Sequence, residues 1–161
     1  MNSLYTKHMK KNLSEALGID LGDTIFTKEN GVRFPFRGSY RVIKRLIEER
    51  FKEKSFIVSR VTPEQKIRAL AMLKEDGFHE LTGLPPKNVE FCELRHEKAP
   101  ICERLGITHF IDDRPEVMSH MEFVPHRFLF RPIPEDVELF KNKLEGVTIV
   151  QSWAEIEKLL L

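Results

Sequence analysis

Three acidic residues stand at positions from which they could share a metal ion. Asp20 closes a short apolar run that begins at Ala16, and Asp112 and Asp113 follow a second run at 107–111. Such runs are typical of buried parallel strands, and ligands of an open α/β sheet collect at the carboxyl ends of its strands. Three carboxylates at one edge repel one another unless a hard cation lies between them, and Mg²⁺ prefers oxygen ligands. The pattern therefore indicates a small Mg²⁺ site suited to phosphate chemistry.

A hydroxyl and an ammonium could complete this site. Ser59 follows the apolar run 56–58, where its hydroxyl could donate to a phosphate oxygen. Lys98 opens a predicted helix at 98–105 and offers a compact positive charge. Lysine is unfavourable at a helix N-terminus, because the macrodipole there prefers negative charge, so this placement favours a functional role. Lys66 is the rival for that role, but it is predicted to lie one turn inside a helix on an exposed face.

Each acid and hydroxyl also has a plainer interpretation. Asp112 and Asp113 precede Pro115 and could simply cap a helix. Ser59 could be an ordinary hydroxyl at a strand end, and Lys98 a solvated helix residue. Taken singly, the acid pair and the serine favour these structural interpretations.

Arginines, cysteines and a histidine near these positions also have two interpretations each. Arg60 and Arg114 each follow a candidate residue and could bind a substrate phosphate, although an exposed arginine is the ordinary interpretation. His96 could face the site but is better interpreted as a surface residue. Cys92 and Cys102 favour core packing over chemistry.

The elements that must position these residues alternate along the chain. Strands are predicted at 16–20, 56–58, 89–92, 107–111, 127–130 and 147–150, and helices begin near 39, 63, 98, 115, 135 and 153. Asn30-Gly31 predicts a hairpin within 25–36, because both residues tolerate positive φ. This alternation predicts an α/β fold, a three-layer α/β/α Rossmann-like sandwich with a mostly parallel sheet and a β-hairpin flap.

Local signals define two of these helices. Ser39 is the expected cap of the helix that contains Val42, Ile43 and Leu46. Thr62, Pro63 and Gln65 form a capping-box pattern, and Ile67, Leu70 and Leu73 are the predicted buried stripe of the helix that follows.

Size and composition bound the class of protein. The chain has 161 residues, 41% hydrophobic and 32% charged, which suits one α/β domain at 14–161 after an N-terminal tail at 1–13. A net charge of +1 gives no general attraction for nucleic acid or acidic lipid. Two cysteines are too few for a disulfide framework, and no apolar run reaches membrane-spanning length. We expect a cytoplasmic protein that does not engage membranes.

The candidate residues, taken in order, resemble the haloacid dehalogenase-like hydrolase superfamily. The four motifs that carry the resemblance are Asp20 with Thr24, Ser59, Lys98 and Asp112-Asp113. Any one of them occurs by chance in many proteins, whereas the four together at strand ends and a helix start form a strong signal. The resemblance extends over roughly the whole chain after the tail, and the predicted hairpin is similar to that family's flap.

The resemblance implies a role for each residue. Asp20 would be the nucleophile that forms a phosphoaspartate, and Lys98 would pair with both Asp20 and the phosphoryl group. Ser59, with Arg60 beside it, would bind the phosphate. The ligands of Mg²⁺ would be Asp20, the backbone carbonyl of Gly22, Asp112 and Asp113, the last of these directly or through a water. Thr24 is expected to stabilise the turn rather than touch substrate.

One residue departs from the family pattern. Gly22 stands where the superfamily's phosphatases carry an acid that protonates the leaving oxygen and then activates water. General acid–base help of that kind is typically worth about 10²–10⁴-fold in rate. Asp23 could take this role, because the backbone turns here and Gly22 can bend freely. The alternatives are a slowly hydrolysed phosphoaspartate, or a scaffold that binds phosphate without catalysis.

The chain also lacks room for a cap domain. Only 14 residues separate Thr24 from Ser39, enough for a flap, and the stretch from Ser59 to Lys98 is used by one helix and one strand. The resemblance then implies a phosphorylated macromolecule as substrate, or a small phosphoester covered by a partner subunit of a homo-oligomer. The segment 33–37 could contact such a partner, or be ordinary core and rim.

Three functions compete on these residues. The first is an Mg²⁺-dependent phosphomonoester hydrolase or phosphotransferase. The second is a non-catalytic module that binds phosphate or protein on the same fold, which Gly22 favours. The third, a response-regulator receiver domain, ranks low because its acid pair precedes the phosphorylated Asp, whereas Asp112-Asp113 comes last here.

Overall fold

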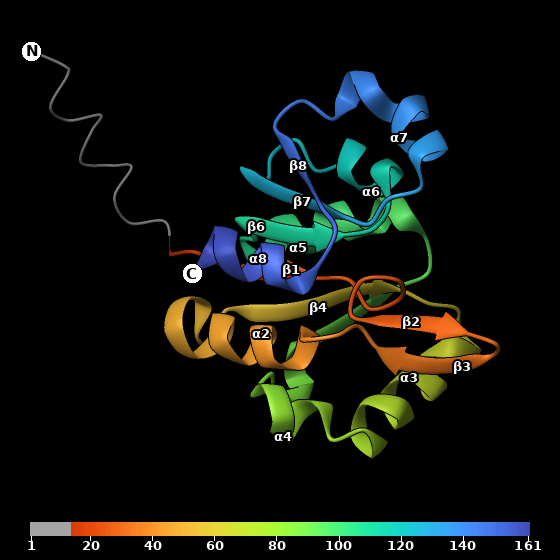
Figure 1. The fold of residues 1–161 in the computed structure, drawn as a ribbon, viewed down its shortest axis with the longest axis vertical. Helices are drawn as coiled ribbons and strands as arrows, with labels where there is room; N and C mark the ends of the chain where they lie inside the picture. The colour runs from red at the N-terminus through yellow and green to blue at the C-terminus, as the bar shows by residue number, and fades with distance from the viewer. Residues whose placement is uncertain (1–13) are drawn as a thin grey trace, which may run out of the picture.

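Six parallel strands form the central sheet in the order β5-β4-β1-β6-β7-β8 (Figure 1). The computed structural model describes residues 14–161. The strands are β1 (Leu17–Ile19), β4 (Ser55–Arg60), β5 (Val89–Cys92), β6 (His109–Asp112), β7 (His126–Phe130) and β8 (Val147–Val150). A separate antiparallel hairpin pairs β2 (Phe26–Glu29) with β3 (Val32–Pro35). The predicted α/β fold with a parallel sheet and a hairpin is confirmed.

Helices cover both faces of this sheet. They are α2 (Ser39–Leu46), α3 (Pro63–Glu75), α4 (Phe78–Thr82), α5 (Lys98–Leu105), α6 (Pro115–Ser119), α7 (Pro134–Phe140) and α8 (Trp153–Leu160). Successive strand residues point to opposite faces, so Ile111 joins one buried cluster with α2 and α8, and Phe110 joins a second with α5 and α6. Two cores with a sheet between them make three layers.

The strand order reverses between β1 and β6, and this reversal positions the acids. From β1 the chain proceeds outward to β4 and β5, then returns to place β6 on the other side of β1. Ile19 pairs with Ile111, and the backbone N–H of Asp20 donates to the Ile111 carbonyl at 3.0 Å. Asp20 and Asp112 therefore leave the sheet side by side at the carboxyl ends of neighbouring strands, where open α/β sheets bind their ligands.

Gly18 allows β1 and β6 to pack this closely. A Cβ added at Gly18 would lie 2.7 Å from the Phe110 ring, a distance that real Cβ atoms do not reach. Phe110 is itself fully buried against α5 and α6, so its ring has little room to move away. A glycine two residues before Asp20 is thus a packing requirement of the strand that carries the acid.

The predicted stripe of α3 is wrong in part. Thr62 caps the helix with Gln65 as expected, and Leu73 is buried. Ile67 and Leu70, however, are 72% and 43% exposed, and Ala69 is buried in their place. Because α3 packs against the short α4 near the edge strand β5, only a narrow face of it is covered.

Two other local predictions also need correction. Gly38, in the left-handed region at φ 80°, occupies the N-cap of α2, so Ser39 is the first helical residue and does not cap with its side chain. Helix α4 was not predicted; it follows Gly77, which also adopts positive φ. Both differences arise where a glycine turns the chain, and the turn decides which residue begins the helix.

Some predictions about the chain as a whole stay predictions. The proposed tail at 1–13 lies outside the described residues, and the single domain at 14–161 stays a prediction. Within the described part of the chain, no helix is long and apolar enough to cross a bilayer.

Candidate metal centre

The three predicted acids come together at the carboxyl edge of the sheet. Asp20, Asp112 and Asp113 each offer one carboxylate oxygen, and these oxygens all lie within 4.8 Å of one another. Asp20 and Asp112 are buried, and Asp113 is half-buried. Asp112 is the last residue of β6 and Asp20 follows β1 directly, so the parallel register itself creates the cluster. These three residues are called the acid cluster below.

Lys98 bridges two members of the acid cluster. Its Nζ donates to Asp20 Oδ1 at 2.9 Å and to Asp112 Oδ2 at 2.7 Å, and its side chain is only 3% exposed. Lys98 is the first residue of α5, which packs against β4. Lys98 is therefore paired with two carboxylates, although a positive charge is unfavourable at a helix N-terminus. Lys66, the rival for this role, is exposed.

Burial and charge repulsion act strongly on the two downstream acids. Burial raises the pKa of Asp113 to about 8, and the neighbouring Asp112 and Asp20 add to this rise. Burial also raises the pKa of Asp112 to about 6, although Lys98 opposes it. For Lys98, burial alone would lower the pKa, but the two carboxylates outweigh it and raise the pKa above its usual range. Lys98 therefore stays charged, whereas Asp112 and Asp113 give up their protons less readily than free aspartates do.

Thr24 and Trp153 fix the turn that follows Asp20. The buried Thr24 hydroxyl lies 3.4 Å from Asp20 Oδ2 and 3.5 Å from Asp113 Oδ1, between the two carboxylates. Trp153, the first residue of α8, donates its indole N–H to the Thr24 carbonyl at 2.9 Å. Thr24 thus stabilises the turn and orients the carboxylates of Asp20 and Asp113, in agreement with its expected structural role.

A small polar cavity opens beside the acid cluster. It has a volume of about 100 Å³ and gathers most of the residues singled out from the sequence. Its lining residues are Asp20, Gly22, Asp23, Ser59, Arg60, Arg95, Lys98 and Arg114. This cavity is called the central cavity below. The structure thus brings the predicted nucleophile, hydroxyl, lysine and arginines around one space, while their chemical roles stay predictions.

Gly22 and Asp23 lie at the mouth of the central cavity. A Cβ added at Gly22 would meet no atom within 4 Å, so the position has open space for a side chain. Asp23 adopts the left-handed conformation at φ 57° and is exposed, with its N–H bonded to the Phe26 carbonyl at 2.7 Å. That turn brings Asp23 to the same cavity as Asp20, rather than to the opposite face of an extended strand.

Arg95 is the cavity residue that the sequence analysis missed. It begins the 3-10 helix Arg95–Glu97 and lies three residues before Lys98. Its guanidinium pairs with Glu116 at 3.0 Å, yet its Nε is buried without a hydrogen-bond partner among the described residues. The spacing from Lys98 was the available signal, because residues three apart share one side of a helical turn.

The remaining candidates have the burial that was expected of them. His96 is exposed, and both cysteines are buried, so their expected surface and core positions are confirmed. In the segment 33–37, Phe36 packs on Phe130 at 5.1 Å between ring centroids, while Phe34 is exposed. That segment supplies both core and rim, as its ordinary interpretation predicted.

The donor set of the acid cluster fits a hard divalent cation. Three carboxylates face one ammonium, which leaves two negative charges uncompensated when all the groups are ionised. A single divalent ion would balance these charges, and oxygen-only ligands favour Mg²⁺ or a similar hard ion over softer metals. In comparisons with known proteins, no protein-family model and no curated sequence matches this chain.

Proposed function

We propose that this protein is an Mg²⁺-dependent phosphomonoester hydrolase or phosphotransferase that works through an aspartyl-phosphate. The observation that carries the proposal is the acid cluster bridged by Lys98, with Nζ 2.9 Å from Asp20 and 2.7 Å from Asp112. Phosphoryl transfer needs a positioned nucleophile and positive charge around the phosphoryl oxygens. The resemblance to the haloacid dehalogenase-like superfamily, described above from four motifs, supports the same chemistry.

In the proposed mechanism, Asp20 attacks phosphorus and the alcohol leaves. The bond from Asp20 Oδ to phosphorus forms as the bond from phosphorus to the ester oxygen breaks, and water later hydrolyses the acyl phosphate. Mg²⁺, held by Asp20, Asp112, Asp113 and the Gly22 carbonyl, would neutralise charge on the phosphoryl group. Lys98 orients Asp20 through its hydrogen bond, while Ser59 and Arg60 receive the phosphoryl oxygens in the central cavity.

The proton for the leaving oxygen is assigned to Asp23. It is exposed, lines the central cavity and lies three residues beyond the nucleophile in a left-handed turn. Gly22 has no proton to give. Turnover through this arrangement should be slow compared with a site that carries an acid at position 22, because Asp23 is exposed to solvent.

A second candidate function follows from Gly22 as well. If Asp23 does not supply the proton, the protein is a phosphate-binding or protein-interaction module on the same scaffold. The acid cluster, Lys98 and the arginines would then bind a phosphorylated ligand without turning it over.

One experiment separates the two functions. Purified protein is given a generic aryl phosphate with Mg²⁺, and product is measured for the wild type and for Asp20→Asn. We expect slow, Mg²⁺-dependent turnover that Asp20→Asn abolishes. Absence of turnover, together with Mg²⁺-dependent capture of beryllofluoride, would favour the binding module; absence of both would reject the site.

Two variants test the assignment of the acid. Gly22→Asp should fold normally, because its Cβ meets open space, and should raise turnover by up to about 10²-fold. Asp23→Asn should lower turnover in the wild-type background and have little effect when it is combined with Gly22→Asp. Unchanged turnover in the single variant Asp23→Asn would remove Asp23 from the mechanism.

A further inference from the structure

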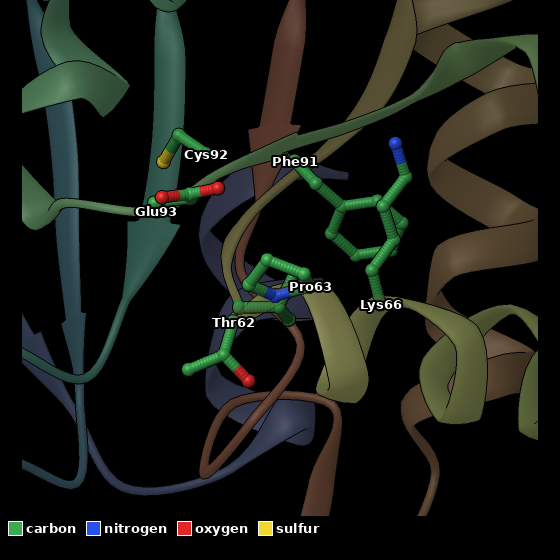
Figure 2. Close-up of a pocket in the computed structure, with 7 residues that line it drawn as sticks. Thr62, Pro63, Lys66, Phe91, Cys92 and Glu93 are labelled. Atoms are coloured by element: carbon green, nitrogen blue, oxygen red, sulfur yellow. The ribbon is translucent and has the colours of Figure 1, made fainter.

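A second hollow adjoins the central cavity at the carboxyl ends of β4 and β5. It has a volume of about 250 Å³ and is called the side pocket here (Figure 2). Its lining residues are Val61, Thr62, Pro63, Lys66, Phe91, Cys92 and Glu93. This volume is smaller than that of typical drug-sized sites, so the side pocket suits a group of about one ring.

The residues that line the side pocket and the central cavity meet at Arg60 and Glu93. Arg60 lines the central cavity, and the next residue, Val61, lines the side pocket. The Arg60 Nε donates to the backbone carbonyl of Glu93 at 3.2 Å, which ties the ends of β4 and β5 together at this boundary. An ester substituent on a phosphoryl group beside Ser59 would have to pass this boundary to reach the side pocket.

The lining of the side pocket favours a flat apolar body. Phe91 is half-buried and, with Pro63 and Val61, provides an apolar surface next to polar groups. Aromatic rings bury large apolar areas and pack well against other rings. An ester substituent with an aromatic ring would shed its hydration on this surface, whereas a polyhydroxylated substituent would lose hydrogen bonds there.

The charged residues Lys66 and Glu93 favour a ligand ring that carries one anionic substituent. The Lys66 ammonium lies 6.0 Å from the Phe91 ring centroid, against an aromatic ring rather than a carboxylate. In Figure 2, Lys66 and Glu93 lie on opposite sides of Pro63. A carboxylate could thus approach Lys66 at one end, while Glu93 would repel a second anion at the other.

We propose that the side pocket binds the leaving group of the substrate, and that this leaving group is an aromatic ring carrying one carboxylate. The inference rests on the proposed function, since the phosphoryl group must occupy the central cavity. It names a substrate class, the carboxyaryl phosphomonoesters, and assigns Phe91 to the ring and Lys66 to the carboxylate.

The test compares two matched pairs of ligands. Hydrolysis of 4-carboxyphenyl phosphate, phenyl phosphate and ethyl phosphate is measured with Mg²⁺ as kcat/KM. Calorimetry gives the Kd of the non-hydrolysable 4-(phosphonomethyl)benzoate and of benzylphosphonate. The variants are Lys66→Met and Phe91→Leu, with Lys74→Met as control, because Lys74 is an exposed lysine in the last turn of the same helix.

The wild type should prefer the carboxylated member of each pair by about fivefold, the size of a partly exposed ion pair. Lys66→Met should remove that preference, so that 4-carboxyphenyl phosphate and phenyl phosphate are hydrolysed with equal kcat/KM. Phe91→Leu should weaken both aryl ligands by about threefold relative to ethyl phosphate. Lys74→Met should behave as the wild type.

Failure of the inference and failure of the proposed function give different results. Equal hydrolysis of all three esters, with no preference between the phosphonates, would overturn the side-pocket assignment and leave the phosphatase intact. No hydrolysis, but a Lys66-dependent preference between the phosphonates, would support the side pocket and reject catalysis. Absence of both hydrolysis and phosphonate binding would overturn both.

Discussion

At the scale of single residues, Lys98 makes the most deeply buried ion pairs among the described residues. Its ammonium is buried between Asp20 and Asp112, so those carboxylates have given up their water for this one partner. A buried ion pair contributes little net stability compared with a well-packed apolar pair, yet removing one partner is severely destabilising. Lys98 is therefore expected to matter for folding as well as for any phosphate chemistry.

The substitution Lys98→Met should lower the free energy of unfolding by about 3–5 kcal/mol at neutral pH, because it leaves two buried acids without a counter-charge. Urea denaturation of the metal-free protein measures this loss, and Lys74→Met, on an exposed position, is the matched control. Part of the loss should be recovered at pH 5, where Asp112 can hold a proton. Equal stability of the two variants would contradict the described ion pairing.

The two raised acid pKa values predict how the stability of the metal-free protein depends on pH. Asp112 and Asp113 have folded-state pKa values of about 6 and 8, above the ordinary value of 3.8. A raised pKa means that the folded protein binds more protons than the unfolded chain, so stability falls as pH rises from about 4 to about 8. Asp113→Asn should flatten the upper part of this dependence, from about pH 6 to pH 8. Chemical denaturation across this range in the presence of a chelator is the measurement.

Metal binding should show the opposite dependence on pH. A cation needs the carboxylates ionised, so its affinity should increase as pH rises toward 8, and binding should release protons. Calorimetry in buffers of different ionisation enthalpy detects this release. A pH-independent Mg²⁺ affinity between pH 6 and 8 would show that Asp113 does not contribute to the site.

At the scale of elements, β1 and β6 must pack closely for the acid cluster to form. Gly18→Ala should lower the free energy of unfolding by about 1–3 kcal/mol, because the new methyl group would lie 2.7 Å from the buried Phe110 ring. Gly22→Ala is the control, since its Cβ meets open space on the same segment. Thermal unfolding of both variants makes the comparison, and an equal change in the two would contradict this packing.

Helix α8, near the C-terminal end of the chain, also supports the site. The indole N–H of Trp153 reaches the Thr24 carbonyl, and Thr24 in turn lies between Asp20 and Asp113. The last helix therefore supports the turn that presents the first acid.

For the whole molecule, occupation of the acid cluster should be visible as stability. A ligand that binds only the folded state stabilises it by about 2.7 kcal/mol at a concentration 100 times its Kd. We expect Mg²⁺ to raise the Tm of the wild type and to leave the Tm of Asp112→Asn unchanged. Differential scanning calorimetry with and without Mg²⁺ measures this, and an equal rise in both proteins would place the ion elsewhere.

The central cavity reaches the surface at Gly22 and Asp23, which are both exposed. The hairpin β2-β3 has an exposed second strand, and the predicted macromolecular substrate or covering partner subunit stays a prediction. The side pocket offers an alternative, in which the chain itself holds a small aromatic ester without a lid. The proposed comparison of aryl and alkyl esters bears directly on that choice.

The sequence by itself determined the alternation of strands and helices and the places where acids follow strands. These are local properties: short apolar runs, a capping box at Thr62 and an Asn-Gly turn each act within a few residues. Because parallel strands end at a common edge, the cluster of Asp20, Asp112 and Asp113 could be predicted from strand ends alone.

Only the tertiary structure decided how these residues face one another. The rotation of α3, which exposes Ile67, depends on packing against α4, and the bridge from Lys98 to two carboxylates depends on where α5 meets β6. The entry of Arg95 into the central cavity has the same origin. These features arise from segments distant in sequence that compete for the same buried space, and no local pattern records the outcome of that competition.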